Sequence, residues 1–583
     1  MTPQERIRSL LAFLYGHEKA ARIWPRWQAM LDDFRQRHPH PHPHPQPGDR
    51  LTERDAILIT YADQFRAPGE PPLQTLFRFL EKHFRGVISG VHLLPFFPYS
   101  SDDGFSVIDY RRVDPRAGTW EHVARLGATY RLMFDAVINH ISRHSDWFQA
   151  YLRGEAPYRD FFIEVPPDAD LSMVVRPRAL PLLTPVNTSR GVRHVWTTFS
   201  DDQIDLNYAN PEVLLAITDL LLFYVSKGAE IIRLDAIAYL WKEIGTPCIH
   251  LPQTHAVVKL WRAVLDAVAP HVILITETNV PHRENVSYFG DGRDEAQMVY
   301  QFPLAPLVLH TFQTREAGKL SAWAAGLETP SRETTFFNFI ASHDGIGVRP
   351  AEGILTAGEM QSLVDQTLAR GGQVSYKSNS DGSRSVYELN ITLYDFLNDP
   401  AAPDPEMDTR RFLASQAIML SLAGVPGIYV HSLFGSRNCL ECVAQTGRPR
   451  SINRQKFDLP ALENRLAQPA SRAARILKGY LHLLRVRRAH PAFHPASPQR
   501  VLSLHPAVFA LLRGDRHPVL CLTNVSPHPV RLVLDGNTVG THTPWHDLLG
   551  AGRFETASPL ELGPYRHVWL SPRGATPRNS RRP

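Results

Sequence analysis

Four short segments place acidic, basic or histidine side chains directly after an apolar run: residues 135–140 (DAVINH), 233–236 (RLDA), 275–278 (ITET) and 342–344 (SHD). Apolar runs of this kind are typical of strands buried in a parallel sheet. Enzymes built on a parallel barrel carry their reactive groups where the strands end. The four segments therefore predict a single polar cluster at the carboxyl rim of a barrel.

Two carboxylates in this cluster point to glycosyl transfer. Asp235 and Glu277 follow neighbouring predicted strands, and a carboxyl pair about 5 to 5.5 Å apart serves a retaining mechanism as nucleophile and proton donor. Arg233 lies on the same face of its strand as Asp235, where its charge favours the ionised carboxylate. Glu277 must carry a proton, and the nearby anion of Asp344 would raise its pKa.

Each of these residues also has an ordinary structural explanation when it is taken alone. An arginine two positions from an aspartate is usually an ion pair, and a glutamate after a strand is often the first residue of a helix. Four such segments at successive strand ends are improbable as structural pairs alone. We therefore predict an enzyme.

The elements that must position these residues alternate between short apolar runs and longer amphipathic ones from residue 56 onward. This rhythm predicts an α/β fold, a (β/α)8 TIM barrel with two insertions at the catalytic face and a C-terminal antiparallel β-domain. The eight predicted barrel strands are Ile57–Tyr61, Val91–Pro95, Arg131–Val137, Ile231–Leu234, Val272–Thr276, Met298–Phe302, Phe336–Ile340 and Pro426–Val430.

The same pattern divides the chain into domains. We expect an N-terminal helical region with a His-Pro linker at 1–50 and a disordered basic tail at 576–583. The barrel is predicted to comprise 51–140, 205–343 and 401–497, interrupted by insertion domain B at 141–204 and insertion domain B′ at 344–400. Residues 498–575 are predicted to form the C-terminal β-domain.

Composition excludes several function classes. The net charge of +5 is small for 583 residues and the basic residues are scattered, which argues against a nucleic-acid partner. No apolar stretch reaches the roughly 18 to 20 residues of a membrane span, and the N-terminal segment has helical spacing between charges, unlike a secretory signal. With four cysteines, these features predict a cytoplasmic protein. A homo-oligomer is left open.

Metal and cofactor motifs give little signal. Cys439 and Cys442 form a CxxC, but a zinc site needs a second ligand pair and none is nearby, so a structural or incidental role is predicted. The sequence has no calcium-loop motif. We predict neither a metal nor a cofactor, and metal binding by the His-Pro tract is disfavoured because nothing folds it into a cage.

The segments DAVINH, IIRLDAIAY, LITET and ASHD, in this order, resemble the signature regions of the α-amylase superfamily (glycoside hydrolase family 13). The resemblance implies that Asp235 is the nucleophile, Glu277 the general acid/base and Asp344 the transition-state stabiliser. It also implies a glucose subsite lined by His140, Arg233 and His343.

Within this superfamily, residues 91–96, 104–110, 176–178 and 451–454 are similar to the sucrose phosphorylase branch. The resemblance implies a small-molecule sugar and inorganic phosphate as substrates. It further implies terminal-hydroxyl contacts from Asp102 and Arg454, an aromatic pair of Phe105 and Phe199, and contacts to phosphate or the acceptor from Arg178, Tyr239 and Tyr387.

The acceptor is indicated by residues 275–282 and 381–390, which resemble the branch members that act on glucosylglycerate more than those that act on sucrose. Sucrose enzymes have an acidic residue near Ser385, whereas here Arg384 precedes a neutral serine, and a planar guanidinium suits a carboxylate. The predicted reaction is retaining phosphorolysis of 2-O-α-D-glucosylglycerate to α-D-glucose 1-phosphate and D-glycerate. Alternatives are phosphorolysis of sucrose, sucrose 6′-phosphate or glucosylglycerol, and a catalytically inactive sugar-binding protein, which the three carboxylates argue against.

Overall fold

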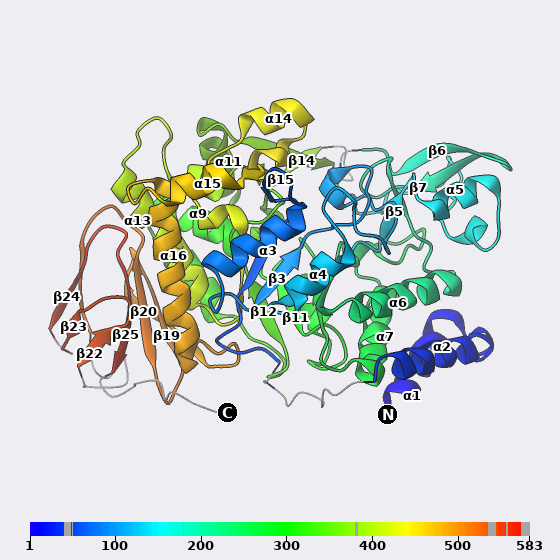
Figure 1. Ribbon diagram of the computed structural model, residues 1–583, viewed down its shortest axis with the longest axis horizontal. Coiled ribbons are helices and arrows are strands. Elements are labelled where there is room, and N and C mark those ends of the chain that lie inside the picture. Colours follow the sequence, from blue (N-terminus) through cyan, green and yellow to red (C-terminus); the bar gives the residue numbers. More distant parts are fainter. Residues whose placement is uncertain are drawn as a thin grey trace.

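Eight parallel strands close into a barrel at the centre of the molecule, which is a computed structural model (Figure 1). The structure describes residues 1–39, 48, 50–178, 180–378, 383–534, 544–555 and 558–572. Most of the His-Pro tract and the predicted disordered tail lie outside these residues. The barrel strands are β1 (Ile57–Thr60), β3 (Gly90–Leu93), β4 (Arg131–Ala136), β9 (Ala229–Leu234), β10 (Ile273–Thr276), β11 (Met298–Tyr300), β12 (Thr335–Asn338) and β16 (Val425–Tyr429).

All eight predicted barrel strands are confirmed, each within two residues at either end. Their side chains are almost entirely buried, because parallel strands in a barrel have packed side chains on both faces. The pairing places Asp135 of β4 beside Arg233 of β9, and Arg233 beside Ile275 of β10. The polar residues that follow these strands therefore emerge at one rim.

Helices alternate with the barrel strands along the chain and pack around them (Figure 1). An amphipathic stripe or a wholly apolar surface on each helix faces the sheet. The main ones are α3 (Pro72–His83), α4 (Trp120–Gly127), α6 (Pro211–Ser226), α7 (Pro252–Val268), α9 (Leu304–Thr314), α13 (Pro405–Ser421) and α16 (Arg472–Ala489).

The N-terminal region consists of α1 (Pro3–Tyr15) and α2 (His17–Arg37), which lie beside α6 and α7 in Figure 1. A capping box fixes the start of α1, since the Thr2 hydroxyl accepts from the Glu5 N–H and the Glu5 carboxylate accepts from the Thr2 N–H. Arg6 binds Asp266 of α7 at 2.5 Å. This helical pair is therefore attached to the outside of the barrel.

Two insertions follow the carboxyl ends of β4 and β12 and so cover the catalytic face. The first contains β5 (His140–Ser142), α5 (Asp146–Arg153), the hairpin of β6 (Leu183–Thr188) and β7 (Gly191–Trp196), and β8 (Gln203–Asp205). The second contains β13 (Ile346–Gly347), α11 (Ala357–Ala369), β14 (Gln373–Ser378), β15 (Arg384–Asn390) and α12 (Leu393–Leu397), and its strands form a sheet in the order β13-β15-β14.

The C-terminal β-domain is confirmed as an antiparallel sheet with the order β18-β19-β20-β25-β22-β23 and a separate pair, β21-β24. It has a core of its own, which includes Leu522, Trp545 and Leu570. The strands are β18 (Gln499–His505), β19 (Val508–Arg513), β20 (Val519–Asn524), β21 (Val530–Val533), β22 (Trp545–Asp547), β23 (Arg553–Phe554), β24 (Pro559–Leu562) and β25 (His567–Pro572).

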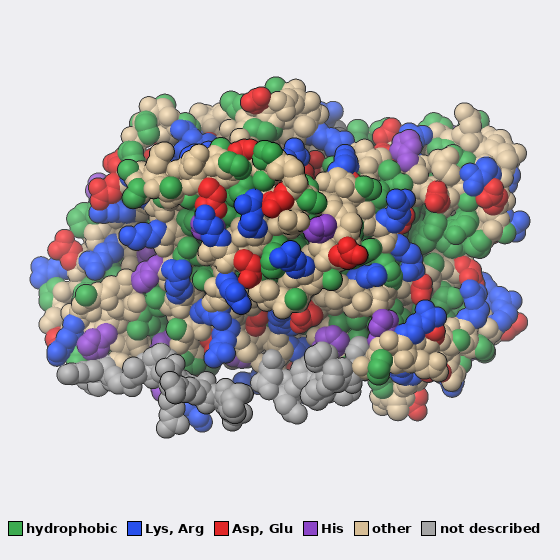
Figure 2. Space-filling view, viewed as in Figure 1, with side chains coloured by type: hydrophobic (Ala, Val, Ile, Leu, Met, Phe, Trp, Pro, Cys, Tyr) green, Lys and Arg blue, Asp and Glu red, His purple; other side chains and the backbone are tan. Residues whose placement is uncertain are grey.

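The face shown in Figure 2 carries basic and acidic side chains side by side rather than in blocks of one sign. A nucleic-acid-binding surface would instead gather Lys and Arg in a continuous stripe. Within the described residues, no helix combines the length and the apolar character needed to cross a bilayer.

Candidate active site

A cavity opens at the carboxyl rim of the barrel, beneath the two insertions. It is lined by all of the predicted site residues except Arg384 and Arg454: Asp102, Phe105, His140, Arg178, Phe199, Arg233, Asp235, Tyr239, Glu277, His343, Asp344 and Tyr387. The three carboxylates thus share one space, as a reaction at a single sugar carbon requires.

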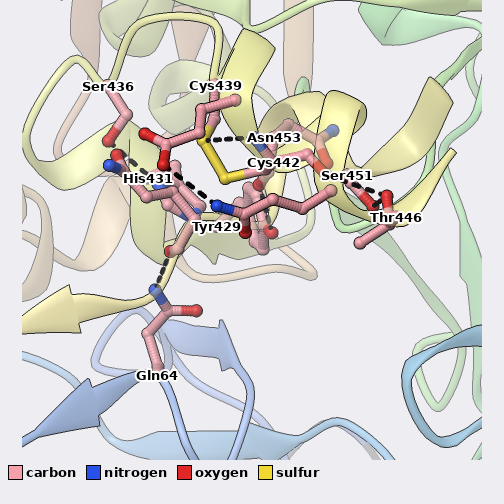
Figure 3. The surroundings of a disulfide bond; sticks show 12 residues. Gln64, Tyr429, His431, Ser436, Cys439, Cys442, Thr446, Ser451 and Asn453 are labelled. Atoms are coloured by element: carbon pink, nitrogen blue, oxygen red, sulfur yellow. Dashed lines mark hydrogen bonds between the residues drawn. A yellow bond between two sulfur atoms is a disulfide. The ribbon is translucent and has the colours of Figure 1, made fainter. Parts of the chain in front are cut away.

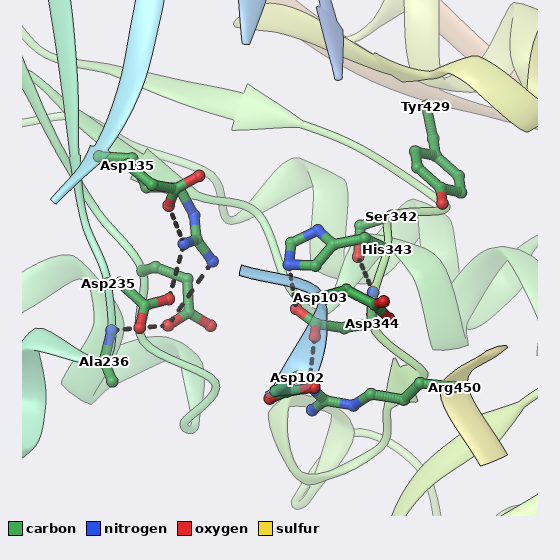
Figure 4. Close-up of polar contacts among 12 residues, drawn as sticks. Asp102, Asp103, Asp135, Asp235, Ala236, Ser342, His343, Asp344, Tyr429 and Arg450 are labelled. Carbon is green, nitrogen blue, oxygen red and sulfur yellow. Dashed lines mark hydrogen bonds and ion pairs between the residues drawn. The ribbon is translucent and has the colours of Figure 1, made fainter. Parts of the chain in front are cut away.

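Arg233 lines the cavity and pairs with Asp135 and Asp235, the two carboxylates labelled in Figure 4. Its side chain is 2% exposed and lies on β9 at a two-residue spacing from Asp235, so both point to the same face of the strand. Its guanidinium donates to Asp235 Oδ1 at 2.6 Å and also to Asp135 Oδ1. Asp135 in turn contacts His92 Nε2 at 2.6 Å. Asp235 is therefore fixed by a chain of buried charges.

Glu277, which follows the neighbouring strand β10, contacts the same part of the site as Asp235. Its Oε2 accepts a hydrogen bond from the Ala236 N–H at 3.0 Å and is 3.9 Å from Arg233 Nη2. Burial raises the pKa of Glu277 to about 7; Arg233 opposes that rise, while the anions of Asp235 and Asp344 add to it. A carboxyl group with this pKa can carry a proton near neutral pH.

The shared proton of this pair belongs on Glu277. Burial also raises the pKa of Asp235, and Arg233 opposes the rise. However, Asp235 receives the direct 2.6 Å bond from the guanidinium, whereas Glu277 is 3.9 Å away from it. Because a close cation stabilises the charged form most, Asp235 is the anion of the pair.

Asp344 is held as an anion by arginines. Burial works to raise its pKa, but Arg450, His343 and Arg454 outweigh burial and lower it well below the usual range. Arg450 Nη1 lies 2.6 Å from Asp344 Oδ1, and the same guanidinium donates through Nε to Glu388 Oε2 at 3.0 Å. Arg450 thus joins Asp344 to the strand β15.

The short helix η7 (Pro449–Asn453) and the residue after it support the loop that carries Asp344. Asn453 donates to the carbonyl of Asp344 at 2.9 Å, and Arg454 Nε donates to the carbonyl of His343 at 2.7 Å. Arg454 Nη1 also pairs with Asp103 at 2.6 Å and Asp102 at 3.4 Å. Arg454 therefore lies behind the cavity wall and acts on it through Asp102, which explains its absence from the lining.

Asp102 and Asp103 both have positive φ values, 53° and 50°. The following residue, Gly104, has φ 112°, and a Cβ there would lie 2.5 Å from the Pro95 carbonyl oxygen. Only glycine permits this close approach. The strained turn presents the Asp102 carboxylate to the cavity.

Aromatic rings form two walls. Phe105 stacks on His343 with centroids 4.9 Å apart and 2° between the planes. Phe199 packs edge-to-face on Tyr239 at 5.7 Å and lies 5.3 Å from the ring of His140. Such rings can cover the apolar faces of a sugar while the charged groups reach its hydroxyls.

Arg178 and Arg384 have different environments. The Arg178 guanidinium lies 5.6 Å from the centre of the Tyr387 ring, at the cavity. Arg384 is exposed at the start of β15 and does not line the cavity. Three residues of extended strand, roughly 10 Å, separate the backbone of Arg384 from that of Tyr387. Acceptor binding by Arg384 therefore stays a prediction that no contact among the described residues supports.

Comparisons with known proteins show the family of this chain. The model of the α-amylase catalytic domain matches residues 86–345. A glucosylglycerate phosphorylase of Allomeiothermus silvanus is 55% identical over 91% of this chain and 94% of its own length. The chain belongs to the α-amylase family.

Two further relatives place this α-amylase family member more narrowly. A glucosylglycerate phosphorylase of Spirochaeta thermophila is 50% identical over 98% of this chain and 99% of its own length. The crystal structure of a sucrose 6F-phosphate phosphorylase from Thermoanaerobacter thermosaccharolyticum superimposes with a TM-score of 0.72 at 25% identity, covering 86% of this chain and 98% of the other. The resemblance to the phosphorylase branch is confirmed.

Some site residues of this α-amylase family member escaped the sequence reasoning. Arg450 and Glu388 both line the cavity, and Asn279 lies between Glu277 and β13. Arg450 directly precedes the segment 451–454, and Glu388 directly follows Tyr387. Both neighbours were predicted to belong to the site, and this adjacency is the signal that could have indicated Arg450 and Glu388. Their pairing joins positions 62 residues apart, which no local pattern reveals.

A buried lysine occupies the junction of the barrel and the first insertion. Lys242 Nζ lies 2.6 Å from Asp205 Oδ2 and 2.7 Å from Asn139 Oδ1. Its ammonium group thus supplies the positive charge between these oxygens. Among the described residues, no group of three or more His, Cys, Asp and Glu side chains has the arrangement of a metal site.

Cys439 and Cys442, for which the sequence offered no zinc partners, are joined to each other by a disulfide (Figure 3). The Cys439 N–H donates to the carbonyl of Ile452 at 2.8 Å, so the disulfide borders η7. This bond was not anticipated from the low cysteine count, which is typical of reduced proteins.

Proposed function

We propose that this protein is a retaining glycoside phosphorylase that converts 2-O-α-D-glucosylglycerate and phosphate reversibly to α-D-glucose 1-phosphate and D-glycerate. The observation that carries the chemistry is the carboxyl pair: Asp235 bonded to Arg233 at 2.6 Å, and Glu277 with a pKa raised to about 7, on one cavity. The similarity to two glucosylglycerate phosphorylases at 50% identity or more supports the acceptor.

In the first step, the ionised Asp235 attacks the anomeric carbon of the glucosyl group, and Glu277 donates its proton to the glycosidic oxygen. The glycosidic bond breaks, D-glycerate leaves, and a covalent glucosyl-enzyme remains on Asp235. Asp344, kept anionic by Arg450, stabilises the positive charge that develops on the sugar.

In the second step, phosphate replaces glycerate in the same space. Glu277, now ionised, accepts a proton from the incoming phosphate, whose oxygen attacks the anomeric carbon and displaces Asp235. Two inversions at one carbon retain the α configuration. Arg178 at the cavity offers a charge-assisted contact to the phosphate.

Six further predicted residues are assigned to the bound glucose. We assign its terminal hydroxyls to Asp102, which Arg454 positions, and its faces to the rings of Phe105 and Phe199. His140 and His343 are placed beside the same rings. Burial lowers the pKa of His343 to about 3, so it is a neutral hydrogen-bonding group at working pH.

A donor screen tests the proposal. Purified enzyme is given phosphate with glucosylglycerate, sucrose, sucrose 6′-phosphate or glucosylglycerol, and release of glucose 1-phosphate is followed, with its anomeric configuration read by proton NMR. We expect the highest kcat/KM with glucosylglycerate and an α product. A higher value with sucrose would assign the alternative activity, and a β product would exclude the double displacement.

A further inference from the structure

We propose that Arg349, with Asn279 beside it, forms the subsite for the acceptor, in which Arg349 binds the carboxylate of D-glycerate. This inference rests on the proposed function and replaces Arg384 as the carboxylate-binding group. It names a specificity-determining residue on the second insertion, separate from the residues that react.

Arg349 does not itself line the cavity, but the segment that carries it borders the cavity wall. Gly347 of β13 lines the cavity, and the N–H of Val348 donates to the carbonyl of Tyr387 at 3.2 Å. The segment that carries Arg349 is therefore attached to β15 at the residue that forms the Tyr387 wall. This attachment fixes the backbone from which the Arg349 side chain extends.

The Arg349 guanidinium has little to bind within the described residues. Its side chain is 15% exposed, and the nearest recorded carboxylate, Glu284, is 4.0 Å away at the limit of an ion pair. Its Nε is buried and has no hydrogen-bond partner among the described residues. A buried guanidinium in this condition carries an unmet desolvation cost, which a bound anion would offset.

The charge of Arg349 acts on the cavity itself. Burial raises the pKa of Tyr239, which lines the cavity, to about 12, and Arg349 is the foremost of the charges that oppose this rise. Arg178 opposes the rise as well. The charges of Arg349 and Arg178 thus act on Tyr239 together with the opposing charges of Glu277 and Glu284, and Arg178 lines the cavity beside Tyr239.

Asn279 completes the subsite. It follows Glu277 by two residues and lines the cavity, and its Oδ1 is buried without a hydrogen-bond partner among the described residues. A Cβ on Gly347 would lie 2.6 Å from the Asn279 amide, so glycine is what lets β13 approach this side chain. Asn279 is thus placed between the proton donor and the Arg349 segment, where it can bind an acceptor hydroxyl.

Glycerate, rather than phosphate, is the anion that this position suits. Glu277 protonates the glycosidic oxygen, and this oxygen leaves with glycerate. One carbon atom separates it from the carboxylate of glycerate. Asn279 follows Glu277 by two residues and lies against Gly347, which precedes Arg349 by two residues. A planar guanidinium can bind a planar carboxylate through two parallel hydrogen bonds, and Arg178 remains available for phosphate.

The test compares Arg349→Gln with the matched control Arg384→Gln. Phosphorolysis of glucosylglycerate and of glucosylglycerol is measured, since the second donor carries a neutral hydroxymethyl group in place of the carboxylate. We expect Arg349→Gln to lower kcat/KM for glucosylglycerate about 10- to 100-fold, the size of a lost charge-assisted bond, and to leave glucosylglycerol within about threefold. Arg384→Gln should leave both donors within about twofold, as surface changes usually do.

A third readout separates glycerate from phosphate. Conversion of glucose 1-phosphate in the presence of arsenate proceeds without glycerate, and it should be unchanged in Arg349→Gln. If this reaction and both phosphorolyses fall together with a raised KM for phosphate, Arg349 binds phosphate and the inference is wrong. The inference is also wrong if Arg349→Gln keeps the preference of the natural enzyme for glucosylglycerate, although the proposed function then stands. If the natural enzyme itself does not use glucosylglycerate, the proposed function fails and the inference fails with it.

Discussion

The two halves of the cavity treat buried charge differently. On the glucose side, each arginine has close carboxylates: Arg233 has Asp135 and Asp235, and Arg450 has Asp344 and Glu388. On the acceptor side, within the described part of the chain, Arg349 has only a 4.0 Å contact and Arg178 has a ring as its neighbour. The charged groups of the glucose side are thus paired with one another before substrate binds. The guanidinium groups of the acceptor side are left with hydrogen-bond donors that a substrate can use.

This difference has a physical basis. The chemistry on the glucose side is the same for every donor, so its groups gain from being fixed in advance. The acceptor side must bind two different anions in turn, glycerate and phosphate, and release each of them. Changes on the glucose side should therefore affect all substrates equally, and changes on the acceptor side should discriminate among them.

The largest effect is expected for Asp235→Asn, which removes the nucleophile from the glucose side of the cavity. We expect kcat to fall at least about 10⁴-fold for every donor. Because Arg233 keeps Asp135 as a partner, the fold should persist. Glucose 1-phosphate consumption and the melting temperature measure the two effects. Residual activity above about 1% of the natural level would contradict the role of Asp235.

Arg450→Gln should have the next largest effect, because it removes the charge that holds Asp344 ionised. We expect kcat/KM to fall about 100- to 1,000-fold with all donors alike, which is typical for losing one electrostatic stabiliser. Glu388 is 1% exposed and would lose its partner, so stability should fall by about 3 to 5 kcal/mol.

The double variant Arg450→Gln, Glu388→Gln is the control for this prediction. It removes the unpaired buried charge, so denaturant unfolding should show most of the stability regained while the activity stays low. A double variant with recovered activity would mean that Arg450 only supports the fold.

Arg178→Ala tests the acceptor side of the cavity. We expect the KM for phosphate to rise about 10- to 100-fold, since one charge-assisted bond is lost, while hydrolysis of glucose 1-phosphate by water is retained. The measurement is the phosphate dependence of the initial rate at saturating donor. A uniform loss in kcat without a change in KM would instead assign Arg178 to the glucose side of the cavity.

The smallest effect is expected for the pH dependence of activity and stability that arises from Glu277. Since Glu277 acts as an acid and its pKa is raised to about 7, kcat/KM should be highest below that pH and fall about tenfold per pH unit above it. A carboxyl group with a raised pKa contributes stability below its ordinary pKa of 4.5, and this is lost as the pH rises through about 7. Glu277→Gln should therefore remove the part of the fall in melting temperature that lies between about pH 4.5 and 7. A pH profile that stays flat to pH 9, about two units above the expected midpoint, would contradict the role of Glu277.

Much of the fold could be predicted because a buried parallel strand has a local signature. Each barrel strand is a short apolar run, and Arg131–Ala136 and Ile273–Thr276 were recognised for this reason. Asp235 and Glu277 were predicted by the same signature, because they come directly after such runs, and the structure brings both to one cavity. Acceptor binding by Arg384 was predicted from the resemblance of residues 381–390, and it stays a prediction, because the side chain is exposed and does not line the cavity.

The sequence by itself determined the barrel, the order of its strands and the carboxylates at their ends, since local periodicity and strand-end position follow from neighbouring residues. Only the tertiary structure decided which charges meet: Arg450 with Asp344 and Glu388, Lys242 with Asp205, and Arg349 with no close partner among the described residues. These pairings join residues that are distant along the chain. They depend on how the insertions fold over the rim, because the strength of an electrostatic contact is set by distance and burial, neither of which a linear pattern contains.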